Sequence, residues 1–454
     1  MLRRIALGLV LSLAAAAAQA AENVTEFFLD NGMQVVVIED HRSPAVTHMV
    51  WYRAGAADEP WGVSGVAHFL EHLMFKATDE LESGEFSRIV EANGGTDNAF
   101  TSWDYTGYFQ RVAADRLGLM MEMEADRMRD LRFADEEVVT ERSVILEERA
   151  QRVDSSAGGL FSEQMRAALY RNHPYGIPII GWRHEMEQLD RDALTAFYDA
   201  NYWPNNAVLI VAGDVTPEDV RTLAEEHYGP IPANPDVTER VRPQEPPQNA
   251  DRRVVFRDER VANPYISRSY PAPARQSGDQ RQAAALTLLA EVLGGSGQTA
   301  VLSRRLQVEE ERSVYASAFY DSTSYDPSSF NLVNVPVPGI TLEEAEADLD
   351  RVISEFLEQG IDPAQFERIK FQIEASRIYE EDNVQGLARK YGVALTSGLT
   401  VEDIEAWPDV LASITVDEVM EEARRLFEDT HSVTGYLMQP EADETATAAE
   451  EVMQ

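Results

Sequence analysis

Residues 65–74 read Gly-Val-Ala-His-Phe-Leu-Glu-His-Leu-Met, and the interpretation of the whole chain starts from this stretch. Residues 66–75 have helical character, so His68 and His72, four positions apart, are expected on one helix face within reach of a single ion. Zinc accepts imidazole nitrogen, and three protein ligands leave a position for water. Glu71 lies beside His72, where its carboxylate can take the proton from the attacking water and pass it to the leaving amine.

The order of these residues makes the zinc interpretation specific. Two histidines at this spacing are a weak signal, because they can lie at the edge of a core with a glutamate paired one turn away. The order His-x-x-Glu-His is the inverse of the common zinc-peptidase signature and is much more specific. The other six histidines form no comparable cluster. The chain has no cysteine, which excludes thiolate ligands, cysteine nucleophiles and disulfides.

A third zinc ligand must come from elsewhere, and the helical pattern over residues 135–152 contains three candidate glutamates. On a helical wheel, the buried face is centred on four apolar residues, Val138, Val139, Ile145 and Leu146. Glu147 projects away from that face, whereas Glu148 lies on the same side as Glu141. The wheel therefore favours Glu148 over Glu147 as the ligand, with Glu141 supporting the site by hydrogen bonding and counted among its catalytic residues.

The first twenty residues predict a secretory signal peptide. Arg3 and Arg4 form a basic start, residues 5–18 are apolar, and Ala18-Gln19-Ala20 is a cleavage site of the small-x-small type. The apolar run is short for a membrane anchor, and no later segment is long and apolar enough to span a bilayer. We expect an exported protein, periplasmic or secreted, without stable membrane insertion.

The chain is strongly acidic, with 79 acidic and 39 basic residues and a formal net charge of −40. Repulsion disfavours nucleic acid as a partner. Two interpretations of the acidity remain open. One is a solvated surface adapted to salt, and the other is attraction of basic peptide substrates.

A proline-rich polar stretch at residues 230–251 predicts a semi-rigid linker. It separates an N-terminal domain, residues 21–229, from a C-terminal domain, residues 252–440. An acidic, alanine-rich tail at residues 441–454 is expected to be disordered.

The two domains look like repeats in the order of their elements. Strand patterns occupy residues 33–38, 46–53 and 207–213, and a second long helical pattern covers residues 111–128. Each domain begins with strand-like sequence, continues into a loop and a helix, and ends with a long helix before an apolar strand. Within this repeat, residues 216–228 are expected to correspond to residues 415–427.

Residues 65–72, taken with Phe-Lys-Ala-Thr at 75–78, resemble the insulinase, or pitrilysin, family of metallopeptidases. In that family a ligand glutamate follows the motif at a distance comparable with the 75 residues between His72 and Glu148. The resemblance is dense in the first half of the chain and only an outline in the second. It continues in residues 94–101, 173–175, 180–181, 202–206 and 212–214.

The resemblance implies an α+β fold of two homologous, sandwich-like halves, each an antiparallel sheet with helices, which close around a chamber. It implies a zinc-dependent endopeptidase that hydrolyses extended peptides or unfolded segments, with one zinc per chain because the second half has no such motif. An extended peptide is expected to add as a strand along Asn98, Ala99 and Phe100.

One position departs from the family pattern. Active members hold the substrate carbonyl and oxyanion with an arginine and a tyrosine seven residues apart; here Tyr315 is present, but Val308 stands at the arginine position. Arg304, Arg305 or Arg312 is a candidate substitute, or a partner chain supplies the pair. We therefore expect a dimer, either of two copies or with a related zinc-less subunit. The alternative function is a non-catalytic scaffold subunit of the same fold.

Overall fold

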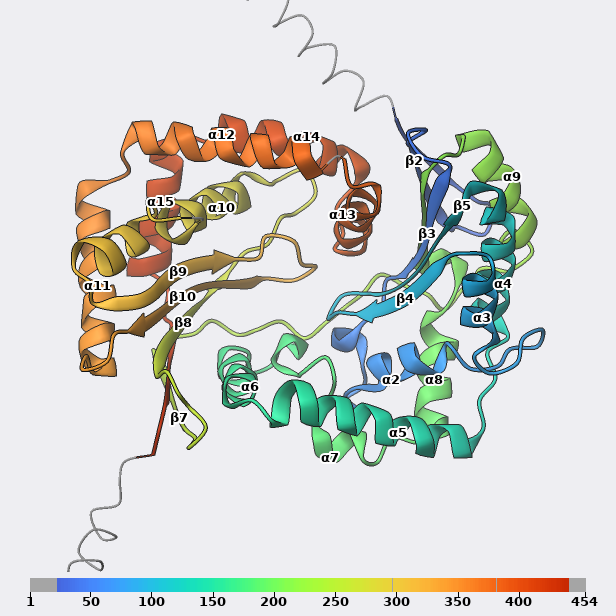
Figure 1. The fold of residues 1–454 in the computed structure, drawn as a ribbon, viewed down its shortest axis with the longest axis horizontal. Helices are drawn as coiled ribbons and strands as arrows, with labels where there is room; N and C mark the ends of the chain where they lie inside the picture. The colour runs from blue at the N-terminus through green and yellow to red at the C-terminus, as the bar shows by residue number, and fades with distance from the viewer. Residues whose placement is uncertain (1–22, 296, 381, 441–454) are drawn as a thin grey trace, which may run out of the picture.

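The structure is a computed structural model that describes residues 23–295, 297–380 and 382–440. The predicted signal peptide at residues 1–20 and the tail at residues 441–454 lie outside the described residues. The described chain forms two halves, each built on one β-sheet with helices packed against it (Figure 1). This confirms the expected fold class of two α/β halves. None of the helices in the described part of the chain is long and apolar enough to cross a membrane.

The first half contains a six-stranded sheet in the order β1-β2-β6-β3-β5-β4. Its strands are β1 (Val24–Phe28), β2 (Gln34–Glu39), β3 (Ala45–Tyr52), β4 (Thr96–Thr101), β5 (Thr106–Ala113) and β6 (Ala207–Gly213). Its helices are α2 (Val66–Leu73), α3 (Glu85–Ala92), α4 (Leu117–Arg129), α5 (Asp135–Arg149), α6 (Ala157–Leu169), α7 (Arg183–Met186), α8 (Arg191–Asn201) and α9 (Pro217–His227). Short turns of helix are η1 (Ala56–Asp58), η2 (Ala114–Arg116), η3 (Ala150–Asp154), η4 (Pro174–Gly176) and η5 (Pro204–Asn206). Strands β2 and β6 are parallel, the other pairs are antiparallel, and β4 is an open edge.

Both faces of this sheet are buried, which explains the continuous apolar sequence of β6. Leu209 and Val211 face a core that includes α2, α4 and α5. Val208 and Ile210 face the opposite side, where helix α13 (Val384–Thr396) of the second half packs. Because successive side chains of a strand point to opposite faces, a strand covered on both sides needs apolar residues at every position.

The second half contains a five-stranded sheet in the order β7-β11-β8-β10-β9. Its strands are β7 (Arg252–Arg257), β8 (Tyr265–Ala272), β9 (Ser313–Tyr320), β10 (Ser328–Pro336) and β11 (Val433–Met438). Besides α13, its helices are α10 (Arg281–Gly294), η6 (Ser303–Glu309), α11 (Leu342–Gln359), α12 (Pro363–Glu380), α14 (Val401–Ser413) and α15 (Val416–Glu428). Strands β7 and β11 are parallel, and β9 is an open edge in the position that β4 has in the first sheet.

The halves exchange one helix each (Figure 1). Helix α13 packs on the first sheet, where a Cβ atom added at Gly392 would lie 2.0 Å from the Trp51 ring. Helix α6 packs on the second sheet, where a Cβ atom added at Gly435 would lie 2.2 Å from the Met165 sulfur. Glycine at both positions permits this close approach. The exchange ties the halves together through packed cores in addition to residues 230–251, which contain neither helix nor strand.

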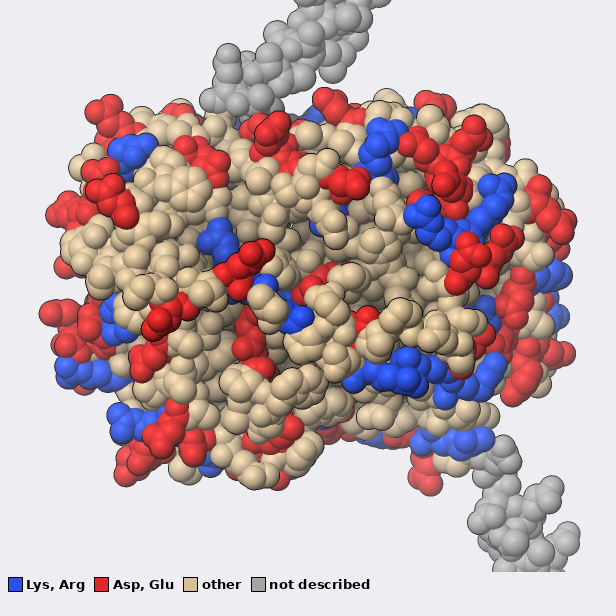
Figure 2. All heavy atoms as spheres, turned by 180° about the vertical axis from the view of Figure 1, so that it is seen from behind, with Lys and Arg blue, Asp and Glu red and all other residues tan. Residues whose placement is uncertain are grey.

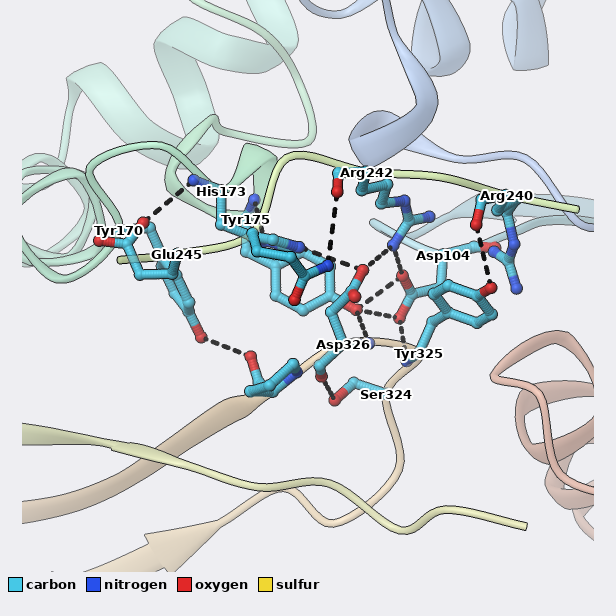
Figure 3. A network of polar contacts seen from close by, with 12 residues as sticks. Asp104, Tyr170, His173, Tyr175, Arg240, Arg242, Glu245, Ser324, Tyr325 and Asp326 are labelled. Carbon is cyan, nitrogen blue, oxygen red and sulfur yellow. Dashed lines mark hydrogen bonds and ion pairs between the residues drawn. The ribbon is translucent and has the colours of Figure 1, made fainter. Parts of the chain in front are cut away.

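A buried polar network also joins the halves (Figure 3). Arg242 lies in residues 230–251, between the two halves. Its guanidinium contacts the carboxylates of Asp58 and Asp104 in the first half and of Asp326 in the second. The Tyr175 hydroxyl donates to Asp104 at 2.7 Å and accepts the backbone N–H of Asp326 at 3.1 Å. Asp104 lies in the turn between β4 and β5, so the network fixes the end of the open edge strand relative to the second half.

Two expectations about elements are wrong. The helix predicted over 111–128 begins only at Leu117, because residues 111–113 belong to strand β5. Side chains along this strand alternate between the two faces of the sheet. The expected match between residues 216–228 and 415–427 also fails. Helix α9 follows the last strand of its sheet, whereas α15 precedes β11, so α8 is the counterpart of α15. Both α9 and α15 begin with a threonine N-cap, and this local similarity made them look equivalent.

Candidate metal centre

Helix α2 places His68 and His72 on one face, as the sequence predicts, and its large apolar residues on another. Phe69, Leu70 and Leu73 are fully buried in the first core. This packing fixes the helix and leaves His68 and His72 together on the other side, with their ring centroids 4.9 Å apart.

The start of α2 is held by residues that the sequence analysis did not single out. Its N-cap is Gly65, which has no side chain to accept from the free backbone N–H groups of the first turn. The Glu59 carboxylate takes that role and accepts the N–H groups of Gly65 and Ala67, each at 2.9 Å. Glu185 accepts the N–H of Ser64 at 2.8 Å. The helix that carries both histidines is thus anchored by acidic side chains at its N-terminus.

Helix α5 brings Glu141 and Glu148 toward the histidines. Its buried residues are Val138, Glu141, Ile145 and Arg149, and Glu148 is half-buried beside them. Val139, which the wheel placed at the centre of the buried face, is 58% exposed. Glu147 is exposed and accepts a hydrogen bond from Gln151. The choice of Glu148 over Glu147 agrees with this placement. The buried face of α5 includes Glu141 and Glu148 and is therefore rotated away from Val139.

Three ligand-type atoms converge at one point. The Glu148 Oε2 atom lies 3.6 Å from His68 Nε2 and 3.4 Å from His72 Nε2. Tetrahedral zinc, bonded at about 2.0–2.2 Å, separates its ligand atoms by roughly 3.3–3.6 Å. Glu148 Oε2 is buried and accepts no hydrogen bond from any described residue, while Arg152 pairs with the other oxygen, Oε1. The donor set therefore fits a zinc ion, and it is the single cluster of this kind among the described residues.

Glu141 supports this cluster through His72. Its Oε1 atom lies 2.8 Å from His72 Nδ1, and its Oε2 atom lies 2.7 Å from Lys76 Nζ. The hydrogen bond with His72 and the charge of Lys76 outweigh burial and lower the pKa of Glu141 to about 2. A charged Glu141 orients the imidazole so that Nε2 points to Glu148.

The two histidines have different electrostatic environments. Burial lowers the pKa of His68 to about 4, so this imidazole is neutral and can bind a metal. Burial also lowers the pKa of His72, but the hydrogen bond with Glu141 and the nearby carboxylate of Glu148 outweigh it and raise this pKa to about 9. In the metal-free chain a proton on His72 thus neutralises part of the acidic cluster, and a cation that binds there would displace it.

Glu71 is held beside the cluster by the neighbouring strand. The Thr101 hydroxyl, at the end of β4, donates a hydrogen bond to Glu71 Oε2. Burial raises the pKa of Glu71, and the Thr101 hydrogen bond and the nearby His72 act in the opposite direction. A buried carboxylate next to a metal site, with one oxygen left free, is suited to general-base catalysis.

Asn98, Ala99 and Phe100 lie on β4, with an unpaired strand edge as expected for peptide binding. The N–H of Ala99 donates to the Asn98 side chain at 2.9 Å. Ala99 packs toward the core that contains α2, while Phe100 packs on the other face against Trp51 and the Arg389 guanidinium.

Tyr315 lies on the edge strand β9 of the second half, with 43% of its surface exposed. No hydrogen bond, ion pair or ring contact within the described residues joins Tyr315 to the metal cluster. Val308 is exposed on η6. Arg305 pairs with Glu355 and Glu310, and Arg312 with Asp348, while Arg304 approaches Glu309, at 3.6 Å.

Sequence reasoning missed five residues of the site: Glu59, Lys76, Thr101, Arg152 and Glu185. Lys76 and Thr101 fall within the stretches that carry the family resemblance, and Arg152 stands four positions after Glu148, the spacing of a helical ion pair. Glu59 has no such signal, because its role depends on how a loop folds back on the helix.

Two α/β halves that bring two histidines and a glutamate together beside a further carboxylate have the donor set of the zinc hydrolase class. The chain belongs to the insulinase family, peptidase family M16, a family of zinc proteases. Residues 34–182 match the family described as insulinase (peptidase family M16), and residues 188–373 match the peptidase M16 inactive domain. The second match agrees with the absence of the His-x-x-Glu-His motif from the second half.

Relatives match over nearly the whole chain. Zinc protease PqqE of Helicobacter pylori is 29% identical over 92% of both chains. The uncharacterized zinc protease Rv2782c of Mycobacterium tuberculosis is 30% identical over 83% of this chain and 84% of that protein.

Solved structures have the same fold. A protease from Helicobacter pylori superposes with a TM-score of 0.85 at 27% identity, covering 92% of this chain and 99% of that one. The periplasmic protease PqqL of Escherichia coli superposes with a TM-score of 0.79 at 20% identity, covering 95% of this chain and 50% of that one. At that lower identity the likeness concerns the fold alone.

Proposed function

We propose that this chain is a zinc-dependent endopeptidase acting on extended peptides or unfolded segments. The observation that carries the proposal is the convergence of His68 Nε2, His72 Nε2 and Glu148 Oε2 at distances that suit tetrahedral zinc. Family membership supports the same metal and the same class of reaction.

In this proposal His68, His72 and Glu148 hold one zinc ion, which would polarise a water molecule and the carbonyl of the scissile bond. Glu71 takes the proton of the attacking water and delivers it to the nitrogen of the leaving amine. Glu141 keeps His72 in the orientation that aims Nε2 at the centre.

The open edge of β4 supplies the binding mode. Backbone groups of Asn98, Ala99 and Phe100 would pair with an extended peptide, which gives affinity without strong sequence preference. Most strands of a folded substrate are already paired on both sides or protected at the sheet edge, so unfolded segments are favoured.

The acidity of the chain bears on the choice between a solvated surface and a site for basic peptides. Figure 2 shows acidic side chains scattered over one face of the molecule, interspersed with basic ones, rather than gathered in one patch. On the face that Figure 2 shows, this distribution supports a solvated acidic surface over a dedicated site for basic peptides.

The test uses the purified chain and a library of unstructured peptides with blocked termini. We expect the wild-type chain to bind one zinc and to cleave internal bonds. Glu71→Gln should keep the zinc, but its cleavage rate should fall by on the order of 10²- to 10⁴-fold, because an amide cannot accept the proton. Glu147→Gln is the matched control, since the exposed neighbour makes no contact with the centre.

Two results would count against the proposal. If Glu71→Gln kept a near-normal rate, the base assignment would be wrong. If the zinc-free chain cleaved as fast as the zinc-loaded chain, the proposed metal dependence would be wrong.

We also infer that the protein is exported. The basic start, apolar run and cleavage-type site of residues 1–20 support this. Expression with and without these residues, followed by cell fractionation and N-terminal sequencing, tests it. Cytoplasmic retention of the uncut full chain would contradict it.

A further inference from the structure

Thr101 connects the open edge strand β4 to the proposed base, Glu71. It is the last residue of β4, where a peptide would add, and its hydroxyl donates to Glu71 Oε2 on α2. Among the described residues, no other side chain or backbone group forms a hydrogen bond with the Glu71 carboxylate.

The orientation of Thr101 follows from the register of its strand. Ala99 and Phe100 pack against opposite cores, and alternation returns Thr101 to the side of Ala99, where α2 lies. Thr101 pairs with Thr106 on β5. The strand therefore presents one hydroxyl to the helix while its free edge remains open.

The segment that follows Thr101 is held rigidly. The carbonyls of Ser102 and Trp103 accept the N–H groups of Ala56 and Ala57, each at 2.9 Å. The Asp104 carboxylate receives hydrogen bonds from Tyr175 and Arg242 in the network of Figure 3. A hydroxyl on such a fixed strand end has little freedom to follow a displaced carboxylate.

We propose that Thr101 is a positioning residue that aims Glu71 in the proposed peptidase reaction. Its hydrogen bond occupies Oε2 and fixes the plane of the carboxylate, so that Oε1 is the oxygen that receives the proton of the attacking water. Because the same residue ends the strand that binds the peptide, it sets the base relative to the bound backbone. The inference rests on the proposed function.

The test compares Thr101→Val, which keeps the shape and removes the hydroxyl, with Thr101→Ser, which keeps the hydroxyl. General-base catalysis contributes about 10²–10⁴-fold, so a misaimed base should lower kcat by about 10- to 100-fold. We expect KM, zinc content and thermal unfolding of Thr101→Val to stay close to wild type. Thr101→Ser should recover most of the lost kcat.

Ser87→Ala is the matched control. Ser87 donates to the Asp97 carboxylate at 2.6 Å near the other end of β4, so this variant removes the same kind of bond away from the centre. It should leave kcat unchanged.

The outcomes separate the two proposals. A wild-type chain that loads zinc but cleaves no peptide, even with a related zinc-less subunit co-expressed, would refute the proposed function, and the role of Thr101 with it. An active wild type with an unchanged kcat in Thr101→Val would overturn the positioning role alone. Loss of zinc, a rise in KM that accounts for the whole effect, or failure of Thr101→Ser to recover kcat would also overturn it.

Discussion

Adjacent glutamates on α5 differ in function because they leave the helix in different directions. Glu148 Oε2 points at both histidines, whereas Glu147 is exposed and accepts a hydrogen bond from Gln151. Glu141, seven positions before Glu148, reaches the centre indirectly through His72 Nδ1. A single helix thus supplies a candidate ligand, a supporting carboxylate and an uninvolved neighbour.

Zinc affinity should rank these three residues. We expect Glu148→Gln to weaken zinc binding by on the order of 100-fold or more and Glu141→Gln by about 10- to 100-fold. Glu147→Gln should change the zinc affinity little. Competition with a chromophoric chelator measures the three affinities. A larger loss for Glu147→Gln than for Glu148→Gln would refute the geometry of the centre.

At the scale of elements, α2 depends on a carboxylate from outside the helix. The Glu59 side chain takes the place of the missing N-cap side chain at Gly65 and anchors the first turn. The histidines follow within that turn and the next, so their positions are tied to this anchor.

We expect Glu59→Gln to lower the free energy of unfolding by about 1–3 kcal/mol and to weaken zinc binding. The amide places an NH₂ group against one of two backbone N–H donors, which leaves a buried donor without an acceptor. Denaturant unfolding measures the first effect and chelator competition the second. Glu122→Gln on the exposed face of α4 is the control, and equal effects of the two variants would contradict the capping role.

Helix α14 has an acidic cap whose contribution should depend on pH. Asp403 accepts the N–H groups of Thr400 and Gly278, each at 2.9 Å. Burial raises the pKa of Asp403, but these backbone hydrogen bonds outweigh it and lower the pKa to about 2. A carboxyl with a lowered folded-state pKa stabilises the fold above its unfolded value, near pH 4, and loses this contribution as pH falls.

Asp403→Asn should therefore cost about 2 kcal/mol at pH 7. The difference from wild type should shrink between about pH 4 and pH 2. Denaturant unfolding at several pH values measures this, with exposed Glu402→Gln as the control. A difference that stays constant down to pH 2 would rule out the charge of Asp403 as its cause.

At the scale of the whole molecule, the halves are joined in two ways. Helices α6 and α13 are exchanged between the sheets, and Arg242 connects three carboxylates from both halves. The Arg242 side chain is 3% exposed, so water cannot take its place beside the three carboxylates if the guanidinium is removed.

Arg242→Met should lower the free energy of unfolding by about 3–5 kcal/mol, because it leaves buried carboxylates uncompensated. Adding Asp326→Asn should recover part of that loss, since one unpaired charge is then removed. Arg281→Gln, which breaks an exposed pair with Glu418, should cost less than about 1 kcal/mol. An effect of Arg242→Met as small as that of Arg281→Gln would contradict the role of the network.

We also propose that full activity needs a second, related chain that carries the arginine–tyrosine pair. Val308 provides no donor, and Arg305 and Arg312 already pair with acidic side chains. Loss of one oxyanion donor costs on the order of 10²–10³ in kcat. We expect the lone chain to bind zinc with low turnover and a co-expressed homologue to raise it. Robust turnover of the lone chain that disappears in Arg304→Ala would instead identify the substitute.

The sequence alone predicted the zinc motif, the helix that bears it and the preference for Glu148. Each of these depends on residues within one helix, where a period of 3.6 residues determines which side chains share a face. The strand at residues 207–213 was also predictable, because a strand buried on both faces has a local pattern, a continuous apolar run. The family resemblance supplied the two-half fold.

Only the tertiary structure decided how these elements meet. The Glu59 cap, the hydrogen bond of Thr101 to Glu71, and the exchange of α6 and α13 all join residues from separate elements. The same non-local packing leaves Tyr315 exposed on the edge strand of the second half and exposes Val139. No local period encodes such contacts, since they depend on which buried faces pair when the chain closes on itself.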